Sequence, residues 1–567
     1  MSIQIPDLTS TDKSEMESSN PTNSGSNGER SAADSIQEKQ DGIETLPTGE
    51  EPEYATGWRL FFIMLTIFMS TLLFALEIGI ISTAIPGITD DFHRLDDVGW
   101  YGSATLLVSG ACAPMWGKVF KYLNVKYSYL VSVLLYLIGS IVAAAAPNST
   151  ALIVGRAIQG LGGGGTLSGS LLVIHLVAQP KRRPVLIGAW MGIFMVATIL
   201  GPVIGGAFTS GVTWRWCFWI NLPLGGPIVV LTLLFLQVPK HVKPVQAPWK
   251  EILLQLDLPG FSFLLASLVC LTLALQWGGQ TKSWNEGTVI ATLVLWIFLT
   301  GVFFIVEWHQ GARALMPLNL LKPRTTWTNV LYCYMINAAL FQVMFYLPIY
   351  FQSIKGQSAI MSGVNCLPFL AFFALGSLVS GAAIGKTRHL QPFELIGALL
   401  VTAGAALLYT LGIDSSQARY VGPQVLFGFG LGLGNQVPMT AVQGFSEPEY
   451  VASSTAIMLM SQALSGAYFV PVAQSVFANC LLQALEFAAR GINPIQVLNA
   501  GASELQHVFS GEDLAAVRSA YLVGIKDVFA FSLAVSAFAV LLALIIPFKR
   551  LPDHGSKKPE EGTTVTA

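Results

Sequence analysis

The chain has 567 residues, of which 53% are apolar and only 11% are charged. Soluble globular proteins carry about 25% charged residues, so this composition excludes an ordinary soluble domain and indicates a chain that lies mostly in a membrane. The net charge of −2 excludes nucleic acid as a partner, because a surface that binds phosphates has to be basic. The six cysteines are scattered through apolar segments without ligand or disulfide spacing, and we expect no metal and no cofactor.

The N-terminal segment, residues 1–57, has the opposite composition. It holds twelve Asp or Glu and three Lys or Arg, together with many Ser, Thr, Gly and Asn. Such a segment buries too little apolar surface to offset its chain entropy, and we expect a disordered, acidic cytoplasmic tail. A basic region followed by an apolar one is missing, so we expect no cleaved signal peptide.

Fourteen apolar segments follow, each long enough to span a bilayer, which takes roughly 20 residues. We therefore predict an all-α polytopic membrane protein with fourteen transmembrane helices. The predicted helices lie near residues 59–82, 99–120, 127–146, 151–177, 184–209, 217–238, 256–276, 288–308, 326–353, 363–384, 392–412, 420–442, 452–480 and 524–548.

The distribution of Lys and Arg predicts the orientation. With the N-terminus inside, the inner loops and C-terminal tail hold eighteen of these residues and the outer loops hold eight. Cytoplasmic loops carry the excess of positive charge, so we expect both termini in the cytoplasm, which requires an even number of spans. We expect a plasma-membrane protein, with the vacuolar membrane as the alternative.

Weak internal repetition divides the chain. The pattern of residues 99–130, two apolar helices around a basic loop, returns at 363–400, and the glycine-rich segment 151–177 has a counterpart at 420–442. Parallel repeats of this kind are typical of transporters whose substrate site lies between the two halves. The predicted divisions are an N-terminal six-helix bundle at 58–240, a two-helix insert with linkers at 241–325, a C-terminal six-helix bundle at 326–548 and a cytoplasmic tail at 549–567.

The longest predicted outer loop is 481–523. It is mildly amphipathic, and Glu512 and Asp513 suit the first turn of a surface helix that starts after Ser510. A second outer feature is the glycosylation sequon at Asn148. Its loop is very short, and we expect it to stay unmodified.

Two charged residues lie well inside apolar segments, Glu77 in the first and Arg156 in the fourth. A charge at the bilayer centre costs roughly 2.5–3.5 kcal/mol, so each should face a cavity or a partner. At 1.5 Å per residue, they lie roughly 13 Å and roughly 9 Å below the outer surface, which allows them to meet. One interpretation is a carboxyl group that takes up and releases a proton beside Arg156. The other is a permanent ion pair that joins the two helices.

Glycines mark the fourth and fifth predicted helices. The run from Gly155 to Gly165 looks like a dinucleotide loop, but it lies inside a membrane span with no strand before it, so we reject a nucleotide site and expect close helix packing. In the fifth helix, small residues recur on one face, and Pro202 interrupts the backbone hydrogen bonds. This face is either ordinary close packing or a bendable seam between the two halves. Its small residues are Gly188, Gly192, Ala197, Gly201 and Gly205.

Several motifs together carry a family resemblance. Arg156, Gln159, Gly160 and Gly162 match an RxxQGxG pattern, and Gly201, Pro202, Gly205 and Gly206 match a GPxxGG antiporter motif. The segments 98–104 and 214–223 fit the same group. Residues 55–548 resemble the major facilitator superfamily, in its fourteen-span drug/proton antiporter branch, and are most similar to fungal multidrug and toxin efflux pumps.

The chain departs from that family pattern at two places. In the first helix, Glu77 stands where the family usually has Asp, and Gly79 stands where it has Thr. After the second helix, Lys121 and Asn124 replace the usual Asp and a second Gly. A carboxyl group survives in the first helix, so the resemblance still implies proton exchange at Glu77.

Aromatic and amide side chains in the C-terminal half suggest a substrate cavity. Such a wall suits a bulky, neutral, amphipathic molecule, although helix packing explains any single residue equally well. The candidates are Tyr332, Tyr334, Asn337, Phe341, Gln342, Phe345, Tyr346, Asn365, Asn435, Gln436 and Gln462, of which we favour Tyr334, Asn337, Phe341, Gln342, Asn435, Gln436 and Gln462.

The resemblance implies proton-coupled efflux of a hydrophobic small organic molecule, such as a secondary metabolite, toxin or drug, by alternating access. Two alternatives stay open: proton-coupled uptake of a siderophore or nutrient, and a sensor that does not transport. No group of residues supplies the acid, base and nucleophile of an enzyme, and no phosphate loop for ATP is present in the sequence. We expect a monomer in the lipid bilayer whose partners are the substrate and protons.

Overall fold

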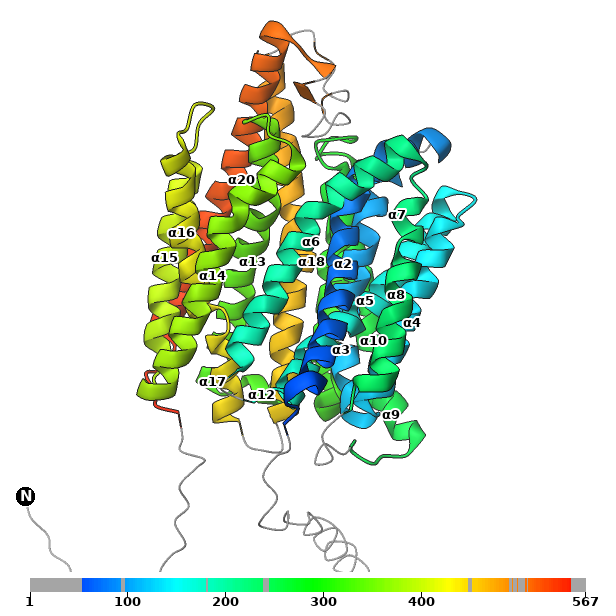
Figure 1. Ribbon diagram of the computed structural model, residues 1–567, viewed down its shortest axis with the longest axis vertical. Coiled ribbons are helices and arrows are strands. Elements are labelled where there is room, and N and C mark those ends of the chain that lie inside the picture. Colours follow the sequence, from blue (N-terminus) through cyan, green and yellow to red (C-terminus); the bar gives the residue numbers. More distant parts are fainter. Residues whose placement is uncertain are drawn as a thin grey trace, which may run out of the picture. The chain divides into compact units, whose positions relative to one another are not determined.

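In a computed structural model, residues 54–551 are described except 93–96, 180–181, 238–243, 447–450 and most of 489–507. The predicted acidic tail and the predicted C-terminal tail lie almost wholly outside the described residues. The described part consists of helices and short connections and contains no β-strand, which confirms the all-α prediction (Figure 1).

The first group of helices packs around α5. In this group α4 and α3 pack against α5, α2 packs along α6, and α8 fills the groove beside α2 and α4. The helices are α2 (Gly57–Phe92), α3 (Val98–Tyr122), α4 (Val125–Ala144), α5 (Ser149–Val177), α6 (Arg183–Gly211), α7 (Trp216–Trp219) and α8 (Asn221–Phe235).

The last group packs around α16 and α20. Here α14 and α15 pack against α16, while α13, α15 and α18 pack against α20. The helices are α13 (Arg324–Ser353), α14 (Ala359–Thr387), α15 (Gln391–Tyr409), α16 (Gln417–Gly434), α17 (Val437–Phe445), α18 (Val451–Ala488) and α20 (Gly511–Ile545).

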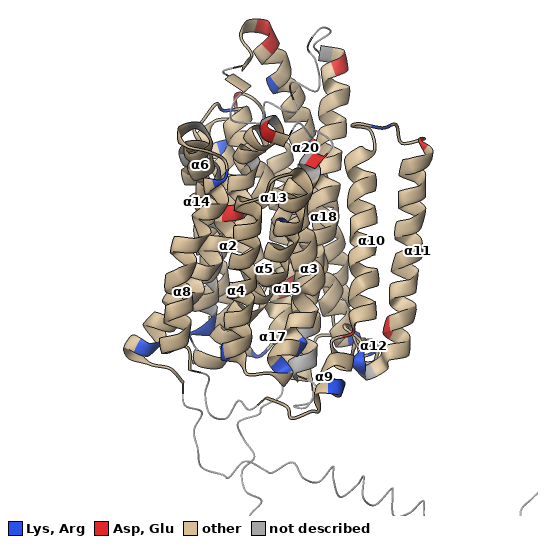
Figure 2. Cartoon of the chain, turned by 90° about the vertical axis from the view of Figure 1, so that its right-hand side faces the viewer, with Lys and Arg blue, Asp and Glu red and all other residues tan. Residues whose placement is uncertain are grey.

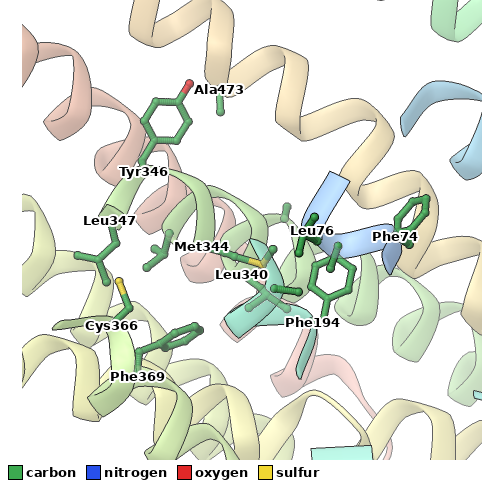
Figure 3. Packing of buried hydrophobic residues seen from close by; sticks show 14 of the residues in the cluster. Phe74, Leu76, Phe194, Leu340, Met344, Tyr346, Leu347, Cys366, Phe369 and Ala473 are labelled. Carbon is green, nitrogen blue, oxygen red and sulfur yellow. The ribbon is translucent and has the colours of Figure 1, made fainter. Parts of the chain in front are cut away.

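The two groups meet along two helix pairs, α3 with α18 and α6 with α14. Between these pairs the contact is apolar: Leu76 of α2 and Phe194 of α6 lie near Leu340 and Met344 of α13 (Figure 3). An apolar interface without interlocking charges can separate and re-form without leaving buried ions unpaired.

The segment between the groups forms a helical pair. It comprises α9 (Trp249–Gln255), α10 (Leu258–Trp277), α11 (Gly287–Gln310), η2 (Gly311–Arg313) and α12 (Leu318–Leu321). Helix α10 packs on α11 and also touches α3 and α18. These two helices form one of the two contacts between the groups. This packing is compatible with the predicted six-two-six division, which stays a prediction.

Twelve helical segments of the described residues are long and apolar enough to cross a membrane. Helices α3 and α6, with 25 and 29 residues, fall outside that set but pack among its members. Together they would make fourteen, so the predicted count is compatible with the structure and stays a prediction. Lys and Arg gather mainly at the end of the bundle where α9 and α12 lie (Figure 2).

Several helix boundaries differ from the predicted ones. The predicted helix 420–442 is interrupted at Asn435 and Gln436, because Pro438 has no amide hydrogen to donate to the carbonyl of Gly434. The predicted helix 217–238 is likewise divided into α7 and α8. Helix α2 continues past Pro86 to Phe92, ten residues beyond its predicted end at 82.

The predicted surface helix after Ser510 is present, but it is not separate. Ser510 precedes α20, which carries Glu512 and Asp513 in its first turn and runs without a break to Ile545. The predicted surface helix and the predicted last span are therefore one helix. No glycine or proline interrupts residues 525–545, and Gly524 is tolerated because it lies close against Phe477 of α18.

Lys118 of α3 anchors one end of the helical pair. Its ammonium group donates hydrogen bonds to the carbonyl oxygens of Gln255, Arg313 and Ala314, at 2.8, 2.6 and 2.6 Å. At the other end, the Asn479 side chain of α18 donates to the carbonyl of Gly278, at 3.2 Å. The pair is therefore attached to both groups of helices, at opposite ends.

We expect Lys118→Met to lower the thermal unfolding midpoint of the purified protein by several degrees. Hydrogen bonds to charged groups contribute about 1.5–3 kcal/mol each, and three of them are lost. Lys121→Met is the matched control, since Lys121 lies one turn away, its ammonium group lies over the ring of Tyr122, and its one described hydrogen bond is accepted by its backbone carbonyl. Equal midpoints for the two variants would contradict the anchoring role.

Candidate functional site

Glu77 of α2 and Arg156 of α5 form a buried ion pair. The Nη1 atom of Arg156 donates to Oε1 of Glu77, and the two residues are only 1% and 2% exposed. Both lie inside long apolar helices, away from their ends, where an isolated charge is expensive and a paired one is tolerated. The structure therefore brings together the two charged residues that the sequence analysis placed at a similar depth.

Side chains from two further helices complete the site around Glu77. The hydroxyl of Tyr136 in α4 donates to Oε2, and the amide nitrogen of Asn221, at the start of α8, lies 3.4 Å from the same oxygen. Asn221 and Gln159 both donate to the hydroxyl of Ser140, at 3.0 and 2.7 Å. The carboxyl group is thus held from several sides, and its position depends on the packing of four helices.

Arg156 has weaker contacts besides Glu77. Its Nη2 atom lies 3.5 Å from the carbonyl of Gly102 in α3, and its guanidinium carbon lies 5.8 Å from the ring centre of Phe218. Its Nε atom has no hydrogen-bond partner among the described residues. If Glu77 became neutral, Arg156 would lose its one ionic partner and keep only these contacts.

A cavity of about 190 Å³ lies beside the ion pair, between the two groups of helices. Its walls are mostly apolar, and Glu77 and Arg156 are the charged residues in them. Pockets for drug-sized ligands usually hold about 300–1,000 Å³, so this cavity is contracted and an organic molecule requires the groups to move apart. From the first group it is lined by Phe74, Glu77, Ile78, Ile81, Ile85, Gly102, Ser103, Thr105, Leu106, Leu107 and Arg156, and from the last by Phe345, Gly466, Ala467, Val470, Pro471 and Gln474.

Helices α3 and α18 pack closely beside the cavity, on the side toward the end of the bundle where α18 begins. A Cβ built on Gly110 of α3 would lie 2.9 Å from the Cβ of Ala467 and 3.4 Å from the carbonyl oxygen of Ala463. The two backbones can approach this closely only because a glycine faces alanines. The contact lies further along α3 than Gly102 and Thr105, which line the cavity.

The antiporter motif lies against the segment that carries Glu77. A Cβ on Gly201 would lie 2.5 Å from the Cα of Gly79 and 2.6 Å from the carbonyl oxygen of Leu76. A Cβ on Gly205, one turn later, would lie 2.8 Å from the carbonyl oxygen of Ile80. The idea that this glycine face forms a seam between the two halves is therefore wrong for these residues, because both contact α2 of their own helix group.

The other motif positions differ in their surroundings. A Cβ on Gly206 would meet no atom within 4 Å, whereas one on Gly160 would lie 2.5 Å from the carbonyl oxygen of Thr105. Gly160 therefore permits the close approach of α5 to α3. Pro202 lies in the helical stretch of α6, and its side chain is outside the described residues.

The seven favoured substrate residues do not line this cavity. Asn337 donates to Asn435 at 3.1 Å, so these two amides satisfy each other between α13 and the α16–α17 break. Gln342 is 1% exposed, and both polar atoms of its amide lack a partner among the described residues. The role of these residues in substrate binding stays a prediction.

The remaining favoured residues lie in the same helix group. The ring of Tyr334 lies 5.2 Å from that of Phe469, and Phe341 packs against Gly466, which itself lines the cavity. Gln436 is at the α16–α17 break, and Gln462 is half-buried on α18.

Three residues of the site escaped the sequence analysis as functional candidates: Tyr136, Ser140 and Gln474. Tyr136 and Ser140 look like ordinary members of an apolar helix, and only the fold shows that they face Glu77 and Asn221. Gln474 had one signal, a lone amide three residues after Pro471 in an otherwise apolar stretch.

Asn148, the sequon asparagine, has a structural role. Its side chain caps α5 by accepting a hydrogen bond from the amide of Ala151 at 2.9 Å. The cap uses Oδ1 and leaves Nδ2, the atom that glycosylation modifies, so the expectation that the sequon stays unmodified remains a prediction. Among the described residues, no group of three or more His, Cys, Asp or Glu is placed to hold a metal ion.

Comparison with known proteins identifies the family of the chain. Residues 67–470 match the model of the Major Facilitator Superfamily. The chain is 67% identical to a dehydrocurvularin exporter of Alternaria cinerariae, over 98% of this chain and 96% of that protein. It is 65% identical to the efflux pump notK of an Aspergillus species, over 93% and 94% of the two chains.

Among solved structures, the fold resembles an inward-facing, occupied bacterial homologue of the human lysosomal transporter Spinster. The TM-score is 0.53 at 15% identity, over 87% of this chain and 97% of that one. At this identity the likeness concerns the fold alone. The family model and the fungal relatives show that the chain belongs to the major facilitator superfamily, in the company of fungal efflux pumps.

Proposed function

We propose that this protein exports a neutral, hydrophobic secondary metabolite across the plasma membrane in exchange for protons. The observation that supports the proposal is the Glu77–Arg156 ion pair in the wall of a cavity between the two groups of helices. A cavity with mostly apolar walls and one ion pair suits an amphipathic molecule that carries no net charge. Dehydrocurvularin, which a relative with 67% identity is named for exporting, is the first compound to test.

Proton exchange follows from the chemistry of the pair. A proton that reaches Glu77 from the outer side neutralises the carboxylate and removes the ionic partner of Arg156. The carboxyl group no longer attracts Arg156 strongly, so α2 and α5 lose one of the contacts that hold them in this arrangement. Release of the proton on the cytoplasmic side restores the ion pair and completes one exchange.

The close glycine contacts explain how this change reaches the rest of the molecule. Gly201 and Gly205 let α6 pack closely against the segment of α2 around Glu77, and α6 also contacts α14 of the other group. A shift of α2 is therefore passed to α6 and to the interface between the groups. Two discrete arrangements of that interface give alternating access.

Export can be tested in fungal cells that lack their own pump for the compound. Cells that express the protein should accumulate less labelled dehydrocurvularin than empty cells and should tolerate more of it. Increased accumulation would instead support uptake. Equal accumulation, with the protein verified at the plasma membrane, would contradict transport of this compound.

A further inference from the structure

A second carboxyl group is buried far along the chain from the ion pair. Glu394 lies in the first turn of α15 and is 0% exposed. Both of its carboxyl oxygens lack a hydrogen-bond partner among the described residues. Glu77, by contrast, has a cation and a hydroxyl donor, so Glu77 and Glu394 sit in opposite kinds of surroundings.

Among the residues that the structure describes, the neighbours of Glu394 carry no charge to balance it. The hydroxyl of Tyr332 in α13 donates to the backbone carbonyl of Glu394, at 2.9 Å, and not to its carboxyl group. Tyr332 and the adjacent Cys333 are the titratable groups that interact with it electrostatically.

The helices packed against α15 also place no charged residue beside Glu394 in the part of the chain that the structure describes. Helix α17 contains no charged residue, and α16 contains only Arg419, near its opposite end. Gln391 of α15 donates to the carbonyl of Ala543 in α20, so Glu394 faces the last part of α20, and residues 528–545 of that helix carry no charge.

Burial of an ionised carboxylate without a partner is strongly unfavourable. The effective penalty is about several kcal/mol per ion in real proteins, whereas the N-terminal end of a helix dipole returns only about 0.3–1 kcal/mol. A bound proton removes the charge and most of the penalty. In this arrangement of the helices, Glu394 is therefore a neutral acid.

The position of Glu394 places that proton beside an interruption between two helices. Gly397, one turn later, lies so close to α16 that a Cβ there would be 2.8 Å from the carbonyl oxygen of Gly430 and 2.9 Å from the amide of Gly434. The helix is interrupted directly after Gly434, at Asn435 and Gln436, which connect α16 to α17. A change in the angle at this break alters the contacts that cover Glu394.

Exposed residues precede the start of α15 by a few positions in the chain. Glu394 is three residues from the start of α15, a rise of roughly 5 Å, and the preceding Lys386 and Thr387 are exposed. We propose that Glu394 is a second proton-binding site, which holds a proton while covered and releases it toward the end of the bundle where α15 begins when the α16–α17 break moves.

This proposal rests on the proposed function, since a second proton has a purpose only in a proton-driven cycle. The balance is simple: each carboxyl group takes one proton from the outer side and gives one to the inner side per cycle. Two protons then enter for each substrate molecule that leaves. Removing the carboxyl group of Glu394 should halve that ratio, whereas removing that of Glu77 takes away the step that links protons to the conformational change.

The test compares the full-length parent with Glu394→Gln in sealed vesicles. The number of protons moved per substrate molecule is obtained from the pH gradient at which a known substrate gradient gives no net transport. Glu394→Gln should move half as many protons per substrate and should lose one protonated-carboxyl band in infrared difference spectra. Glu286→Gln is the matched control, an exposed carboxyl group paired with Lys282. It should match the parent in both measurements.

The outcomes separate the two proposals. If the parent itself moves no protons, the proposed function fails. If the parent is coupled and Glu394→Gln keeps the parental ratio and the parental band, the proposal for Glu394 alone is overturned. Should Glu394→Gln not fold, Glu394→Asp decides by its spectrum: it retains a carboxyl group, so the band should persist at a shifted position, and an unshifted band overturns the proposal.

Discussion

Glu77→Gln is expected to abolish proton-driven export while leaving substrate exchange across the membrane intact. The amide cannot take up a proton at neutral pH, so the step that links protons to the conformational change is lost, whereas exchange of labelled for unlabelled substrate needs no net proton movement. Both rates can be measured in the same vesicles. Loss of both activities in a folded variant would indicate that Glu77 acts in substrate binding instead.

Stability measurements separate proton coupling from a purely structural ion pair. Removal of one member of a buried pair leaves the other charge uncompensated and typically costs about 3–5 kcal/mol. Glu77→Gln and Arg156→Gln should therefore each destabilise the protein, and the double variant should recover most of that loss. If the pair were only structural, the recovered double variant would also recover proton-driven export. We expect it to be stable and uncoupled.

Gly201→Ala is expected to reduce export by about tenfold or more, because overpacking by one methyl group commonly costs about 1–3 kcal/mol and here displaces α2 at Glu77. The added Cβ would meet the carbonyl oxygen of Leu76 at 2.6 Å, and backbone atoms cannot rotate away. Export and proton flux should fall together, since the segment of α2 that contacts Gly201 also carries Glu77.

Gly206→Ala is the matched control within the same motif. A Cβ at this position meets no atom within 4 Å, so parental export is expected. If both variants were parental, close packing against α2 would not be what the motif provides. If both failed equally, a property of the glycine backbone of α6 would explain the motif better than the contact with α2.

Much of the fold was predictable because hydropathy and helix length dominate in a membrane. The apolar segments fell where helices are found, and the charge of Glu77 and Arg156 pointed to a buried pair before any contact was known. The breaks within helices were harder to predict. Pro438 interrupts its helix, whereas Pro114, Pro368 and Pro423 lie inside continuous ones.

The site was predictable only in part. Glu77 stood out because its charge is out of place in an apolar helix, but Tyr136 and Ser140 are common residues that only three-dimensional packing selects. The glycines of α6 were recognised as a packing face, yet a periodic pattern does not say which neighbour it meets. The pattern left open ordinary close packing or a seam between the two halves, and in the structure Gly201 and Gly205 meet α2. Glu394 drew no attention, because it lies close to a basic loop and looks like an ordinary helix-start residue.

The most direct test of the account is proton movement in sealed vesicles that contain the purified protein. A pH gradient, acidic on the side that corresponds to the outer face, should drive dehydrocurvularin toward that side, and added substrate should in turn dissipate the gradient. A protonophore should stop net transport, and Glu77→Gln should show neither effect. Substrate export that proceeds at the same rate with the gradient collapsed would contradict proton coupling through the Glu77–Arg156 pair.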